Sequence, residues 1–71
     1  MFIIQVKSFN GAIYYFSWLT SSLMTDNLQR AAQIPTLKQA LNIVADYELV
    51  AYGTYSVLEA EVVKGKVVIK P

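Results

Sequence analysis

The 71-residue sequence contains no cysteine and no histidine. These absences exclude disulfide bonds, cysteine nucleophiles, the usual zinc sites and any serine–histidine catalytic triad. Charged residues make up only 15% of the chain, and the six basic and five acidic residues leave a net charge of +1. A charge this small does not indicate a protein that seeks nucleic acid or acidic partners.

Long hydrophobic runs are also missing. The longest uncharged stretch covers residues 8–25, but Asn10-Gly11 is a turn signal and only residues 12–19 are densely apolar. A membrane-spanning helix needs about 20 such residues, so we expect no membrane span. The first positive charge, Lys7, follows the apolar N-terminal run, which is the reverse of a signal peptide. The sequence therefore predicts a cytoplasmic protein, and the absence of cysteine fits a reducing compartment.

Hydrophobic residues, in contrast, are abundant at 55%, and Leu, Ile, Val and Phe supply 24 of the 71 residues. This content is too high for a disordered chain. The length allows one domain, residues 1–71, around one core.

The N-terminal third predicts a β-hairpin. Segments 2–9 and 12–19 are rich in β-branched and aromatic residues, and Asn10-Gly11 joins them. Asn-Gly is the most favourable pair for a two-residue type I′ turn, because both positions tolerate a positive φ. In that register Lys7 faces Tyr14, one face is mostly aliphatic and the other is aromatic. Beside Gln5, the aromatic face carries Lys7, Phe9, Tyr14, Phe16 and Trp18.

Helical signals follow in the middle of the chain. Thr25 or Asp26 is a suitable N-cap for a short helical segment over 27–33, which Pro35 ends. Thr36 then caps a main helix whose apolar stripe has spacings of three and four residues. That stripe consists of Leu37, Ala40, Leu41 and Val44. We expect the helix to end at Tyr47, with a longer helix that ends before Gly53 as the alternative.

A second hairpin is predicted at the C-terminal end, with Lys64-Gly65 at its turn. This register places Val62 opposite Val67, Ala60 opposite Ile69, and Glu59 opposite Lys70. Hydrophobic pattern, turn and charge pairing agree. The order β-β-α-β-β predicts an α+β domain with a four-stranded, mainly antiparallel sheet in the order 2-1-3-4. The main helix and the short helical segment are expected on one face of that sheet.

Residues 25–40 resemble a pattern found in small uncharacterised phage and prophage proteins. In those proteins an aromatic hairpin precedes T-D-x-L-x-x-A-x-x-[FI]-x-T-x-x-x-A. The matching residues are Thr25, Asp26, Leu28, Ala31, Ile34, Thr36 and Ala40. The resemblance implies a phage or prophage origin. It implies no activity and no functional residues, and the C-terminal hairpin is not part of it.

Catalysis is not expected from these residues. Glu59 and Glu61 lie on one strand face about 7 Å apart, a separation that would suit an inverting glycosidase, but lysines across the hairpin favour ordinary charge pairing. The glycines form no phosphate-binding loop and the acids are dispersed, so we expect no cofactor and no metal.

The sharpest functional hypothesis is the aromatic face. If the helix covers the aliphatic face, the aromatic one stays open and forms a larger apolar patch than monomers usually expose. It would then bind a protein, either a second copy of the chain or a host protein, or in the alternative it would stack single-stranded nucleic acid. A further alternative is that the hairpin folds over and some of these aromatic residues join the core.

Overall fold

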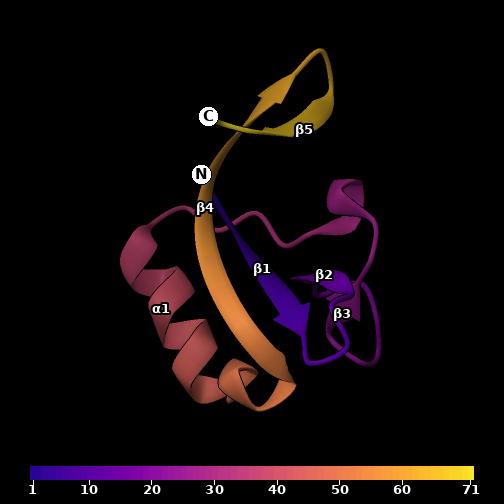
Figure 1. The fold of residues 1–71 in the computed structure, drawn as a ribbon. Helices are drawn as coiled ribbons and strands as arrows, with labels where there is room; N and C mark the ends of the chain where they lie inside the picture. The colour runs from indigo at the N-terminus through magenta and orange to yellow at the C-terminus, as the bar shows by residue number, and fades with distance from the viewer.

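Five antiparallel strands form a curled sheet in the computed structural model, which describes residues 1–71 (Figure 1). The strands are β1 (Phe2–Ser8), β2 (Ile13–Phe16), β3 (Met24–Thr25), β4 (Gly53–Val63) and β5 (Lys66–Ile69). Their spatial order is β3-β2-β1-β4-β5. The α+β class is confirmed, and so is the relative order of the four expected strands. The expected strand number is wrong, because the two-residue β3 adds a fifth strand beside β2.

One α-helix and two short 3₁₀ helices complete the fold. They are α1 (Leu37–Asp46), η1 (Leu28–Arg30) and η2 (Leu49–Tyr52). The Thr36 side chain accepts a hydrogen bond from the Gln39 amide at 3.1 Å, and α1 ends with Tyr47 as its C-cap, both as predicted. Asn27, rather than Thr25 or Asp26, caps η1. No helix combines the length and the apolar character that a membrane crossing needs.

Strand β1 is central and is covered on both faces. Ile4 and Val6 pack with α1 in the main core, whereas Ile3 lies in a smaller cluster on the opposite face. Leu28 of η1 packs against that second cluster. The main helix and the short helical segment therefore cover opposite faces of the sheet, which corrects the expectation that both lie on one face.

The first hairpin differs from the predicted register by one residue. Lys7 pairs with Ile13 instead of Tyr14, because the loop has three residues, Phe9 to Gly11, instead of two. Gly11 has φ of +88°, and its amide donates to the Ser8 carbonyl at 2.9 Å. A three-residue loop that ends in a left-handed glycine is the next most common hairpin connection after the two-residue turn. Because side chains alternate along a strand, this shift moves every β2 side chain to the other face.

The second hairpin has the predicted register. Ala60 pairs with Ile69 and Val62 pairs with Val67. Lys64 and Gly65 both have positive φ, as a type I′ turn requires. The Lys70 ammonium lies 3.3 Å from a Glu59 carboxylate oxygen. Since β4 pairs with β1 only through Glu59, the hairpin projects beyond the rest of the sheet (Figure 1).

The outer edge of β5 is occupied by a side-chain amide. The Gln29 side chain accepts from the Val67 amide at 2.8 Å and donates to the Val67 carbonyl at 3.0 Å. It thereby satisfies both outward backbone groups of Val67, which a further strand would otherwise bind. This contact joins residues 38 positions apart and holds η1 against β5.

Replacing Gln29 with alanine is expected to lower the free energy of unfolding by about 1–2 kcal/mol, because two hydrogen bonds are lost and the β5 edge is uncovered. Urea unfolding followed by circular dichroism measures the change. Gln33→Ala is the matched control, because Gln33 is exposed and its side chain makes no hydrogen bond within the chain. Equal stability of the two variants would contradict a structural role for the Gln29 amide.

Candidate functional site

The five residues of the predicted aromatic face do not share a face. Phe16 is fully buried in the main core. Tyr14 is opposite Val6, and Lys7 is opposite Ile13, so Tyr14 and Lys7 point to opposite sides of the sheet. Phe9 lies in the hairpin loop and is 83% exposed. The five residues therefore do not form the expected continuous patch.

Trp18 forms an aromatic cluster with two of its neighbours. Its ring lies 4.7 Å from the Phe16 ring, edge to face, and 5.7 Å from the Tyr47 ring. Half of Trp18 remains exposed, and it lines an open groove of about 310 Å³. The other residues of this groove are Gln33, Ile34, Pro35, Gln39 and Ile43. The cluster holds the indole in place beside α1.

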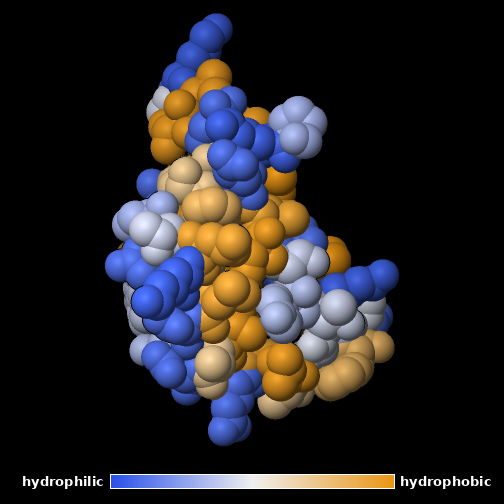
Figure 2. Space-filling model, turned by 90° about the vertical axis from the view of Figure 1, so that its left-hand side faces the viewer, coloured by the Kyte–Doolittle hydropathy of each residue, from blue (hydrophilic) through white to orange (hydrophobic).

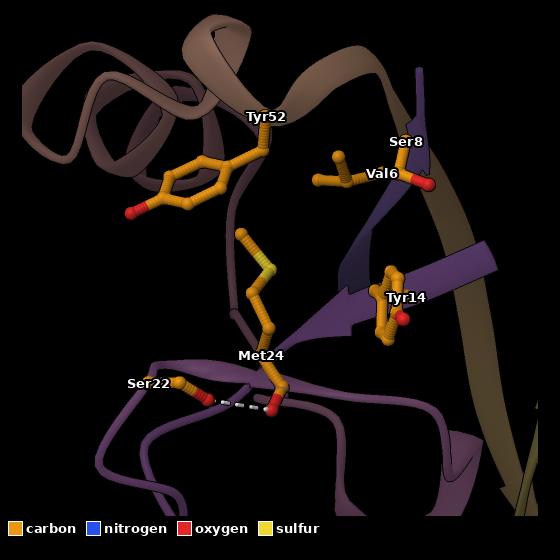
Figure 3. Close-up of a pocket in the computed structure, with 6 residues that line it drawn as sticks. All are labelled: Val6, Ser8, Tyr14, Ser22, Met24 and Tyr52. Atoms are coloured by element: carbon orange, nitrogen blue, oxygen red, sulfur yellow. Dashed lines mark hydrogen bonds between the residues drawn. The ribbon is translucent and has the colours of Figure 1, made fainter. Parts of the chain in front are cut away.

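A second, less open hollow lies where the end of β1 meets η2. It has a volume of about 240 Å³, and its lining residues are Val6, Ser8, Tyr14, Ser22, Met24 and Tyr52. We call it the tyrosine pocket. Figure 3 shows the Tyr52 and Tyr14 rings on opposite sides of the pocket, with the Met24 side chain extending between them. Tyr14 is thus the one predicted site residue that lines this pocket, and Phe9 follows the lining residue Ser8 in sequence.

The two serine hydroxyls of the tyrosine pocket already have partners within the chain. The Ser22 hydroxyl donates to the Met24 carbonyl at 3.3 Å, and the Ser8 hydroxyl donates to the Asn10 side-chain oxygen. No acidic or basic side chain lines the pocket. Its exposed lining is therefore apolar, which suits an apolar group.

Acidic residues are not gathered at either hollow. No group of three or more Asp or Glu side chains lies close enough together to hold a metal ion. Glu59 is paired with Lys70, as expected, and Glu61 is opposite Val68 on the neighbouring strand. Neither hollow is lined by an acidic side chain.

Sequence reasoning assigned only Tyr14 of the six pocket residues to the site, and it missed Met24 and Tyr52 among the other five. Tyr52 is one of three tyrosines between the end of α1 and the first half of β4, with Tyr47 and Tyr55. Only Tyr47 contacts the core aromatic Phe16, at 5.4 Å between the ring centroids. Met24 follows a polar loop, and nothing in that loop's sequence marks its side chain as part of a pocket.

Comparison of the chain with protein-family models, with curated proteins and with solved structures finds no match.

Proposed function

We propose that this chain is a non-enzymatic module that binds another protein, and that the tyrosine pocket receives an apolar side chain of that protein. The observation that carries the proposal is an apolar pocket between two partly exposed tyrosines, without a charged residue. Its volume of about 240 Å³ is below the roughly 300–1,000 Å³ of most small-molecule sites. A single side chain matches that volume better than a cofactor does.

The residues that line the pocket are of the kinds that dominate protein interfaces. Tyrosine combines a large apolar ring with a polar edge, and methionine adapts its unbranched side chain to irregular surfaces. Phe9 adds an exposed apolar ring beside the pocket-lining Ser8. In the phage or prophage setting that the sequence pattern implies, the partner is a host protein.

The aromatic residues do not share one exposed face, and this favours protein binding over the binding of single-stranded nucleic acid. Base stacking along a strand uses several exposed rings beside basic side chains. Here Phe16 is buried, and Lys7 points to the side of the sheet away from Tyr14. The net charge of +1 adds little attraction for phosphate groups.

The NMR signal of the Met24 methyl group tests directly whether the pocket binds an apolar group. The chain has two methionines, Met24 in the pocket and Met1 in the second cluster, so carbon-13-labelled methyl groups give a probe and an internal control. Titration with indole, which mimics an aromatic side chain, is expected to shift the Met24 methyl signal and leave that of Met1 in place. Tyr52→Ala removes one wall and is expected to abolish the shift. Equal shifts of both signals, or none, would contradict the pocket.

Partner binding is tested by the same substitution in a host extract. A protein retained by the immobilised wild-type chain is expected to lose roughly 30-fold in affinity on Tyr52→Ala, the effect of truncating an interface hot spot. Leu19→Ala is the control, because Leu19 is exposed but does not line the pocket. Retention that is unchanged by Tyr52→Ala would argue against this surface.

A further inference from the structure

Half of strand β4 has an unpaired edge. Ala60 exchanges backbone hydrogen bonds with Met1 on the β1 side, and the Glu59 carbonyl accepts from Lys70 on the other side. Backbone groups alternate along a strand, so the amides and carbonyls of Tyr55 and Val57 point away from β1. Strand β5 pairs with β4 only from Ala60 onward. No strand therefore pairs with the outward groups of Tyr55 and Val57.

The other edges of the sheet are short or partly occupied, whereas the outward groups of Tyr55 and Val57 are uncovered. Gln29 occupies the outer edge of β5, and the other end of the sheet is the two-residue β3. Open edges in natural sheets usually carry lysine, proline or a bulge. The open segment of β4, residues 53–58, contains no charged residue and no proline. A bare, uncharged edge indicates a site where another strand adds.

An apolar surface of α1 lies beside this edge. Ile43 and Gln39 line the groove on the Trp18 side of the helix, so Leu37 and Leu41 lie on the opposite side, toward β4. They are 48% and 44% exposed. Figure 2, which looks onto this side of the molecule, shows an apolar band running down it from the C-terminal hairpin. Strand edge and helix side are thus exposed together.

The geometry points to a second copy of this chain as the occupant of the β4 edge, in an antiparallel β4–β4 pair that continues the sheet into the partner. A two-fold axis perpendicular to the sheet places both α1 helices on the same face, side by side. The pairing would bury Leu37 and Leu41 of each copy against the neighbouring helix. This surface is separate from the tyrosine pocket, so the inference does not rest on the proposed function.

The length of the open β4 edge and the charges of α1 both suit pairing with a second copy of the chain. Helix η2 bounds it before Gly53, and Lys70 bounds it at Glu59. An antiparallel pair centred on Tyr55 places Val57 opposite the partner's Gly53, which fits between these two limits. The only charges within α1 are Lys38 near its start and Asp46 at its end. Antiparallel helices bring the basic end of one beside the acidic end of the other, which favours this pairing.

The test measures two properties of the full chain, its molar mass in solution and the hydrogen exchange of its backbone amides. Light scattering over a dilution series up to millimolar chain is expected to give twice the 8.0 kDa of the single chain at high concentration. Hydrogen exchange of the Tyr55 and Val57 amides is expected to slow as the dimer fraction rises. The Ser56 amide is the internal control, because it faces β1 opposite Gln5 and is protected in both states.

Substitutions in α1 and β4 locate the interface. Leu41→Lys puts an ammonium group into the helix pair and is expected to reduce the mass to 8.0 kDa with an unchanged circular dichroism spectrum. Asn42→Lys, on the polar side of α1, is expected to leave the dimer intact. Should Leu41→Lys unfold the chain, Tyr55→Pro takes its place, because it removes an outward amide that makes no bond to β1. It is likewise expected to give a folded monomer.

Three results would overturn the inference. One is a mass of 8.0 kDa throughout the dilution series. Another is a dimer in which the Tyr55 and Val57 amides exchange as fast as in the dilute chain. The third is a dimer that persists in the folded Leu41→Lys or Tyr55→Pro variant, since the contact would then lie elsewhere.

Discussion

Replacing Phe16 with alanine is expected to cost about 3–5 kcal/mol of folding free energy, as the loss of a buried phenylalanine usually does. The Phe16 ring is fully buried, packs in the cluster that contains Ile4 and Val44, and supports the exposed Trp18 at 4.7 Å. Domains of this size have little stability to spare, with totals of about 5–15 kcal/mol for proteins in general. We therefore expect a large unfolded fraction at room temperature.

Urea unfolding of Phe16→Ala beside Phe9→Ala measures this effect against a matched residue. Both substitutions remove the same atoms from the same hairpin, but Phe9 is 83% exposed and should change stability by less than about 0.5 kcal/mol. An open aromatic face would make the two variants equally stable. That outcome would restore the two-residue turn that the sequence favours and would contradict the observed register.

The register of the first hairpin was the decisive feature that sequence reasoning missed. Asn10-Gly11 supports the two-residue turn, but the Asn10 side chain also accepts from the Ala12 amide at 3.1 Å and from the Ser8 hydroxyl, which suits a three-residue loop. The longer loop brings Phe16 into line with Ile4 in the core. Burial of that ring offsets the less favoured turn. Local turn preference alone could not decide between the two registers.

The C-terminal hairpin and α1 could be predicted because several independent signals agree there. In the hairpin, the turn residues, the alternating apolar pattern and the Glu59–Lys70 pair all select one register. In α1, Thr36 supplies the cap and Ala40 and Val44 supply the buried side. The structure of a segment can be predicted from its sequence when such local signals agree.

The tyrosine pocket could not be predicted from residue patterns. Its residues come from β1, β2, the loop before β3, β3 itself and η2, so no short segment contains its signature. The two-residue turn would put Tyr14 opposite Lys7, whereas Tyr14 is opposite Val6 and lines the pocket with it. The pocket also depends on Gly53, which directs the chain from η2, where Tyr52 lies, into β4.

Replacing Gly53 with alanine is expected to destabilise the fold by about 3 kcal/mol or more. Gly53 has φ of +149° and ψ of −148°, a backbone region that is accessible almost only to glycine. A Cβ atom added there would lie 2.0 Å from the Lys7 carbonyl oxygen and 2.9 Å from the Ser8 Cα. Both are backbone atoms of the central strand, so no side-chain rotation relieves the contact.

Gly11→Ala is the control that measures the strain of a positive φ alone, without the close backbone contact at Gly53. Gly11 has φ of +88°, but an added Cβ would meet nothing within 4 Å, so its substitution should cost only the roughly 1–2 kcal/mol of a left-handed residue. The difference between the two variants in urea unfolding measures how closely β4 approaches β1 at Gly53. Equal losses would mean that the strands separate there without cost. The start of β4 would then be free to move, and neither the Tyr52 wall of the pocket nor the adjoining β4 edge would be fixed by the fold.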